Sequence, residues 1–137
     1  MKLGWITVVR QEATLFRDTL RNNLTLYREM EDSALVDMLR KVGLASLATR
    51  AALDAMVEDH GANFSGGEKK RICLARALLR NTEMLILDEP LANLDDETAG
   101  RIEALLLSIP DRTLLVVSHQ FSEKNLARFD AVMELAG

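Results

Sequence analysis

The sequence of 137 residues is poor in several residue types, and each shortage excludes a class of protein. A single cysteine, Cys73, excludes an internal disulfide and a cysteine-ligated metal cluster. Aromatic residues make up only 4% of the chain, too few for a surface on which nucleic-acid bases stack. No apolar run approaches the ~18 residues that a membrane-spanning helix needs. The N-terminus leads into a short strand-like run rather than a signal peptide.

The overall composition is that of a folded domain with an acidic surface. Hydrophobic residues make up 48% of the chain and charged residues 28%, enough apolar surface to offset the entropy lost on folding. The length suits a single hydrophobic core. The net charge of −4 argues against a dominant nucleic-acid-binding surface.

The order of the predicted elements indicates an α/β fold. The first half is mostly helical, and the second half alternates buried strands with helices, which predicts a parallel sheet with right-handed crossovers. Buried strands are expected at 5–9, 84–87 and 113–117, with a weak final strand at 132–135. Helices are expected at 18–27, 32–42, 45–56, 65–80, 97–108 and 122–128.

Four polar residues follow the predicted strands and are expected at one edge of the sheet, where such folds bind ligands. They are Gln11, Asp88, Glu89 and His119. An aspartate leaving a buried strand can hold Mg²⁺ on a nucleotide, and its glutamate neighbour can activate a water. Each of these residues also has an ordinary structural explanation, such as an acidic exit from a strand or a lone surface histidine.

A glycine pair precedes the longest predicted helix. In Ser65-Gly66-Gly67-Glu68 the glycines allow a phosphate to approach the backbone at a helix N-terminus. The same four residues form the pattern of a capping box, which needs no ligand. Asp95 fits a helix cap in the same way. Lys69, Lys70 and Arg71 are expected to form a solvated helix face.

Together these segments resemble the ATP-binding cassette ATPases, the nucleotide-binding domains of ABC transporters. Gln11 with the segment through Leu24 is similar to the Q-loop region of exporter-type cassettes. Residues 63–68 resemble the family signature motif, with Phe64 and Glu68 in place of the usual Leu and Gln. Residues 84–89 resemble the Walker B strand, residues 92–95 the D-loop, and His119 the switch histidine.

The resemblance implies a role for each motif. Asp88 and Gln11 would support Mg²⁺, Glu89 would be the general base for attack by water, and His119 would contact the γ-phosphate of ATP. The signature residues Ser65, Gly66, Gly67 and Glu68 would bind ATP held by a second nucleotide-binding domain in a head-to-tail dimer. Asp95 would communicate across that dimer.

The resemblance also implies the domain organisation. Residues 1–11 and 81–137 would form part of the P-loop ATPase core. Residues 12–80 would form the α-helical subdomain, ending in the signature motif and its helix, which couples to a transmembrane domain. The protein would act at the cytoplasmic face of the membrane, with no nucleic acid as partner.

The sequence contains no phosphate-binding Gly-x-x-x-x-Gly-Lys motif, because none of its seven glycines is followed by lysine. The chain is therefore interpreted as the C-terminal portion of a cassette domain, from the Q-loop onward. The isolated chain is expected to be inactive as an ATPase and to self-associate through open strand edges. The alternatives are a soluble cassette ATPase of the translation-factor type and a non-catalytic interaction fragment.

Overall fold

The computed structural model describes residues 4–135, and its centre is a parallel three-stranded sheet. Strands β1 (Ile6–Val9), β2 (Met84–Asp88) and β3 (Thr113–Val117) lie in the order β1-β2-β3. Val8, Ile86 and Leu115 are level with one another across the sheet. The expected α/β fold with a parallel sheet is confirmed.

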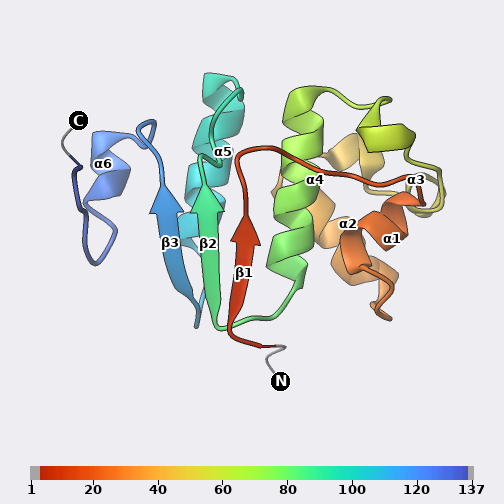
Figure 1. The fold of residues 1–137 in the computed structure, drawn as a ribbon, viewed down its shortest axis with the longest axis horizontal. Helices are drawn as coiled ribbons and strands as arrows, with labels where there is room; N and C mark the ends of the chain where they lie inside the picture. Colours follow the sequence, from red (N-terminus) through yellow and green to blue (C-terminus); the bar gives the residue numbers. More distant parts are fainter. Residues whose placement is uncertain (1–3, 136–137) are drawn as a thin grey trace.

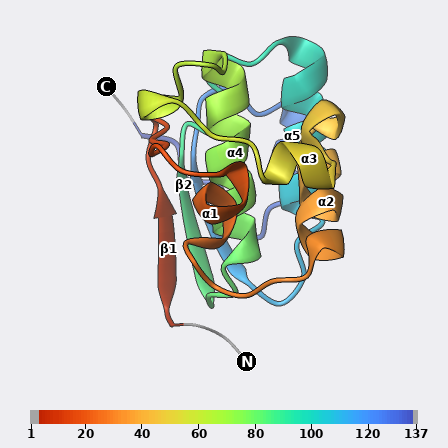
Figure 2. The ribbon, with the colours of Figure 1, turned by 90° about the vertical axis from the view of Figure 1, so that its right-hand side faces the viewer.

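The helices α4 and α5 cover one face of this sheet, α1, α2 and α3 lie beyond α4, and α6 lies at the other end, next to β3 (Figures 1 and 2). The elements are α1 (Leu20–Thr25), α2 (Asp32–Lys41), η1 (Ala45–Leu47), α3 (Arg50–Leu53), η2 (Asp59–Gly61), α4 (Gly66–Leu79), α5 (Asp96–Leu107) and α6 (Glu123–Leu126). Helix α4 stands between β1 and the group α1–α3, so it links the sheet to the helical part of the chain.

A single hydrophobic core runs from the covered face of the sheet into the helical part. Its fully buried members include Leu85 and Leu87 of β2, Ile72 of α4, Ile102 of α5 and Leu39 of α2. These side chains recur every two residues in the strand and every three to four in the helices, which is why the sequence pattern predicted the elements.

The opposite face of the sheet is open among residues 4–135, contrary to the prediction of buried strands. Ile6 and Val8 are both 53% exposed, and Leu115 and Val117 are about half exposed. Trp5, expected in the first strand, precedes β1 and is also exposed. Alternate side chains of a strand point to opposite faces, so helices on one side bury only half of each strand.

Two predicted elements are wrong. The expected helix at 45–56 is broken into η1 and α3, because Thr49 adopts an extended conformation and its side chain caps the new helix at Ala52 N. The expected strand at 132–135 is absent. In that segment Val132, Met133 and Leu135 are exposed and belong to no strand.

The remaining helices begin or end near their expected positions. Helix α1 is shorter than the predicted 18–27, because Thr19 caps its N-terminus and Leu26 ends it in the left-handed conformation. Helix α2 buries Leu35 and Leu39, and Gly43 follows it with φ +83°, a conformation that glycine adopts without steric cost.

Candidate functional site

The polar residues that follow the three strands lie at the same edge of the sheet. Because the strands are parallel and adjacent, their carboxyl ends all point the same way, upward in Figure 1. Gln11 follows β1 and is exposed, Asp88 ends β2 with Glu89 directly after it, and His119 follows β3. The structure brings Glu89 and His119 into direct contact, with Nδ1 of the imidazole 2.8 Å from Oε1 of the carboxylate.

Glu89 is held by its backbone in a sharp turn. Its amide donates to the Val117 carbonyl at 2.7 Å, extending the β2–β3 pairing by one residue. Its φ of +51° lies in the left-handed region, which is unusual for a residue with a side chain. The chain therefore bends at Glu89, directly after β2 ends at Asp88, and the Glu89 side chain contacts His119, which follows β3.

The Glu89 carboxylate has one engaged oxygen and one free oxygen. Only 14% of the side chain is exposed. Oε1 contacts His119, whereas Oε2 is fully buried and has no hydrogen-bond partner among the residues that the structure describes. A buried acceptor without a partner is costly, so this oxygen is suited to receive a hydrogen bond from a water or a ligand.

Asp88, predicted from the sequence to contact Mg²⁺, ends β2 at the carboxyl edge of the sheet and is partly exposed. Within residues 4–135 no group of three or more His, Cys, Asp or Glu side chains could hold a metal by itself. Mg²⁺ usually takes one or two carboxylates and completes its shell with water and substrate phosphate. A single partly exposed aspartate at the end of β2 fits that mode of binding.

The predicted capping box at the start of α4 is formed in full. The Ser65 hydroxyl accepts from Glu68 N at 3.1 Å, and the Glu68 carboxylate accepts from Ser65 N at 2.8 Å. Ser65 and Gly66 are exposed, and a side chain at Gly66 would meet no atom within 4 Å. Helix α4 thus presents an open N-terminus, which favours anions.

The N-terminal end of α4, which contains the predicted signature residues, also lies close to the loop that follows β2. A Cβ on Gly67 would lie 3.4 Å from the Leu94 side chain. Beyond that contact Asp95 caps α5, accepting from Thr98 N at 2.7 Å and from the Thr98 hydroxyl at 3.1 Å. These bonds with Thr98 hold the pKa of Asp95 below its usual value. The structural role of Asp95 as a helix cap is therefore established.

Lys70 and Arg71 do not form the solvated face that the charge run predicted. The Lys70 ammonium is buried and donates to the carbonyls of Glu89 at 2.7 Å and Ala92 at 3.3 Å. Arg71 donates to the carbonyl of Gly43 at 3.0 Å. Helical periodicity could have revealed Lys70, because Cys73, Leu74 and Ala77 lie three, four and seven residues later and are buried.

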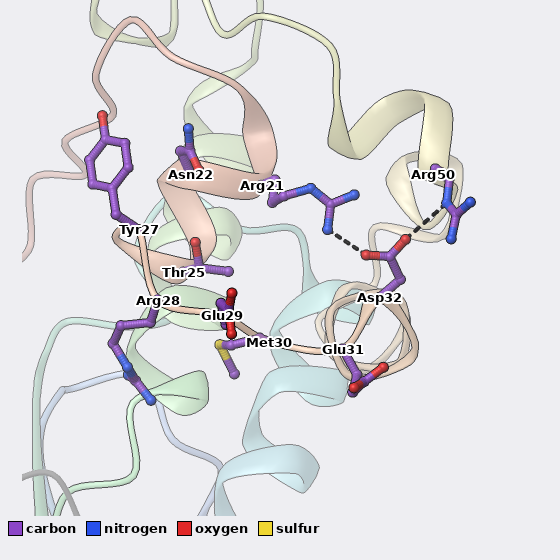
Figure 3. A pocket seen from close by; sticks show the side chains of 10 residues that line it. All are labelled: Arg21, Asn22, Thr25, Tyr27, Arg28, Glu29, Met30, Glu31, Asp32 and Arg50. Carbon is purple, nitrogen blue, oxygen red and sulfur yellow. Dashed lines mark hydrogen bonds and ion pairs between the residues drawn. The ribbon is translucent and has the colours of Figure 1, made fainter.

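A pocket of about 770 Å³ opens in the helical part, far along the chain from the sheet edge (Figure 3). Asp32 lies on its rim between Arg21 and Arg50 and forms an ion pair with each. Leu26 and Tyr27, which bound the same region, are consecutive residues with positive φ. The pocket therefore combines a fixed ionic network with a tight corner of the backbone.

The comparison with protein families decides the assignment. The family model described as ABC transporter matches residues 3–92. The chain belongs to the ABC transporter family. In the described part of this ABC transporter chain, no helix is both long and apolar enough to cross a membrane.

The relatives include an ATP-binding/permease protein and an ATP-dependent flippase. The chain is 39% identical over 130 residues to the glutathione/L-cysteine transport system ATP-binding/permease protein CydC of Escherichia coli, covering 93% of this chain and 22% of that protein. It is 35% identical over 138 residues to the ATP-dependent lipid A-core flippase of Thiobacillus denitrificans, covering 96% and 24%. It thus spans about a fifth to a quarter of the length of these relatives.

A solved structure of a bacterial Atm1-family ABC exporter with ATP bound shares the fold. The TM-score is 0.74 with 27% sequence identity, over 84% of this chain and 21% of that chain. The ABC transporter chain therefore has the architecture of part of an exporter ATPase domain.

Proposed function

We propose that this chain forms part of the ATP-hydrolysing motor domain of an exporter-type ABC transporter. The observation that carries the proposal is the Glu89–His119 pair at the carboxyl edge of the sheet, with the second carboxylate oxygen buried and unpartnered. The relatives described above are transporters, which favours an exporter over a soluble cassette ATPase of the translation-factor type or a non-catalytic fragment.

The proposed chemistry is in-line attack of water on the terminal phosphate of ATP. Bound Mg²⁺ would neutralise part of the negative charge that develops on the phosphate oxygens. Glu89 would orient the water and accept its proton, while His119 holds Oε1 at 2.8 Å. Asp88 would hold the metal ion, and Gln11, exposed at the same edge, would contact the metal ion and the attacking water.

The signature segment would act on a second nucleotide. Ser65, Gly66 and Gly67 lie at the exposed N-terminus of α4, which favours a phosphate, and Glu68 holds this turn in shape through the capping box. Because this end of α4 is open, we propose that it covers ATP bound to a second nucleotide-binding domain in a head-to-tail dimer. Asp95, next to the loop that contacts Gly67, would then lie at the dimer interface.

Residues 12–80 would form the α-helical subdomain, and residues 1–11 with 81–137 part of the ATPase core. We propose that the transmembrane domain docks on the helical subdomain at the pocket of Figure 3, which is large and fixed by the Asp32 ion pairs. Such docking would place the chain at the cytoplasmic face of the membrane.

The test is reconstitution of ATP turnover. The isolated chain is expected to release no phosphate from MgATP at millimolar concentration, because its sequence contains no Gly-x-x-x-x-Gly-Lys motif. Adding a cassette half that carries this motif is expected to restore turnover. Glu89→Gln should abolish that turnover, whereas Glu83→Gln, an exposed glutamate before β2, should not.

Two outcomes would each overturn one part of the proposal. Turnover by the isolated chain that disappears with Glu89→Gln would disprove the predicted inactivity. A stable complex of the two halves that binds MgATP and hydrolyses none would disprove the assignment of Glu89 as general base.

A further inference from the structure

Lys70 is a buried lysine whose ammonium donates hydrogen bonds to the loop that carries Glu89. Among the described residues, no other lysine or arginine is as little exposed to solvent. Its side chain leaves α4, five residues after the capping serine, and only 6% of the residue is exposed. The ammonium donates to the Glu89 carbonyl at 2.7 Å and to the Ala92 carbonyl at 3.3 Å. Burial lowers the pKa of Lys70, and the nearby charges of Glu89 and Asp88 act in the opposite direction.

The two carbonyls that Lys70 binds belong to a turn that needs support. Glu89 has φ +51° and Asn93 has φ +67°, both in the left-handed region, which costs free energy for residues other than glycine. Within the turn, Ala92 N donates to Glu89 O at 3.2 Å and Leu94 N to Leu91 O at 3.3 Å, both long bonds. A charge-assisted hydrogen bond to the same Glu89 carbonyl is stronger than either of these neutral bonds.

The same turn approaches α4 a second time, because the Leu94 side chain lies 3.4 Å from the point where a Cβ on Gly67 would stand. Lys70 and Gly67 are three residues apart and therefore lie on one side of the helix. The loop from Glu89 to Leu94 is thus attached to the signature end of α4 at two points. A movement of that helix end would carry the backbone of Glu89 with it.

We infer that Lys70 is a positioning residue, whose buried ammonium fixes the Glu89 turn on α4 and so holds the Glu89 carboxylate against His119. Lys70 contacts neither the water nor the phosphate in this arrangement. The consequence for hydrolysis rests on the proposed function. In a head-to-tail dimer, Lys70 would link the signature segment serving one nucleotide to the general base serving the other.

The test uses the 137-residue chain without nucleotide, so its outcome is independent of ATP turnover. Lys70→Met removes the donors while keeping a long apolar stem. Lys69→Met is the matched control, because it makes the same change on the neighbouring residue, whose stem packs near Gly61. Backbone amide exchange and the tautomer of His119, read from its ring ¹⁵N shifts at pH ~8.5, are measured by NMR.

In Lys70→Met we expect exchange at Ala92 N and Leu94 N to rise about tenfold or more relative to amides in β2. We expect the His119 ring to shift from the Nδ1-protonated form, which the Glu89 contact favours, toward the Nε2-protonated form. Lys70→Arg, which keeps the charge and the donors, should restore both signals at least in part. A merely structural role in core packing would not change the tautomer.

Lys70→Met with unchanged loop exchange and an unchanged His119 tautomer would overturn the inference. If Lys70→Met does not fold, the parent chain still decides. Its Lys70 ammonium should then give a ¹⁵N–¹H signal protected from solvent exchange, unlike that of Lys69. An unprotected Lys70 signal would overturn the inference equally.

Discussion

The guanidinium of Arg76 lies against the completely buried amide of Asn23. Arg76 donates to the Asn23 carbonyl at 2.7 Å and to its Oδ1 at 3.2 Å, and a further bond reaches the Thr14 carbonyl at 2.9 Å. Asn23 in turn accepts from Phe16 N at 3.0 Å and donates to Phe16 O at 2.9 Å. This arrangement fastens the segment that follows β1 and Gln11 onto helix α4.

We therefore predict that Asn23→Ala strongly destabilises the fold. The substitution leaves the Phe16 amide and carbonyl without their side-chain partner in the core and removes one of the bonds that Arg76 makes, its bond to Oδ1, so the free energy of unfolding should fall by about 2–4 kcal/mol. Asn22→Ala is the matched control, because Asn22 bonds Asp18 on the partly exposed side of the same helix, and it should cost less than about 1 kcal/mol. Urea unfolding of both variants measures the difference, and equal losses would contradict the argument.

The sequence predicted those parts of the fold in which a local pattern and the tertiary packing agree. Strand β3 has the predicted bounds, 113–117. Helix α4 begins after Ser65, as predicted, because a capping box depends only on two residues that are three positions apart in the sequence. The helix at 45–56 was wrong because its Ala and Leu content favours a helix, whereas Thr49 supplies a competing cap in the middle. The strand at 132–135 was wrong because a short apolar run forms a strand only where a partner strand pairs with it.

The site was predictable at the strand ends but not in its supporting contacts. Parallel neighbouring strands fix the common edge of Asp88, Glu89 and His119, so topology alone gathers them. Helical periodicity places Lys70 on the buried side of α4, but its contact with the Glu89 carbonyl depends on a left-handed turn that no residue type in that segment signals. The run Lys69-Lys70-Arg71 therefore had the pattern of a solvated surface although one member is buried.

The capping serine allows stability and phosphate binding to be separated. Aspartate caps helices about as well as serine, and its charge is favourable at a helix N-terminus, so Ser65→Asp should leave the free energy of unfolding within about 0.5 kcal/mol of the parent. Ser65→Ala should lower that free energy by about 0.5–2 kcal/mol. Urea unfolding measures both.

In association with a second cassette that carries MgATP, we expect the two Ser65 variants to rank in the opposite order to their stabilities. The Ser65→Asp carboxylate would repel the phosphate, so association should be lost in that variant and retained in part in Ser65→Ala. Sedimentation with and without MgATP measures the association. Intact assembly by Ser65→Asp would show that this helix end does not face a phosphate.

The ion pairs of Asp32 predict a dependence of stability on pH. The hydrogen bond from Arg21, followed by that from Arg50, holds the pKa of Asp32 below its usual value. A depressed pKa contributes stability above the unfolded-state pKa, and this contribution is lost as pH falls through the folded-state pKa. The parent should therefore exceed Asp32→Asn in stability at pH 7, and the difference should shrink below about pH 4.

Salt gives a second check on the same network, because exposed charges are screened. Asp37→Asn is the matched control on α2, since Asp37 makes one exposed pair with Lys41 at 3.0 Å, whereas Asp32 joins two arginines from different segments. Thermal unfolding between pH 3 and pH 7 at low and high salt measures both variants. The same pH profile in Asp32→Asn and Asp37→Asn would show that the network adds nothing beyond an ordinary surface pair.

The open face of the sheet predicts self-association of the 137-residue chain. Helices α4 and α5 leave an apolar surface uncovered, formed by Ile6 and Val8 of β1 and by Leu115 and Val117 of β3. Strand β3 is also an edge strand among residues 4–135. Exposed apolar patches and free strand edges both promote association between chains.

Light scattering as a function of concentration should show an average mass above 15.3 kDa. Leu115→Lys places a charge in the centre of the patch and should return the mass to that of the monomer, whereas Ala51→Lys adds the same charge to the exposed surface of α3 and should not. A chain that is already monomeric at high concentration would contradict the prediction and imply that the exposed strands are tolerated in water.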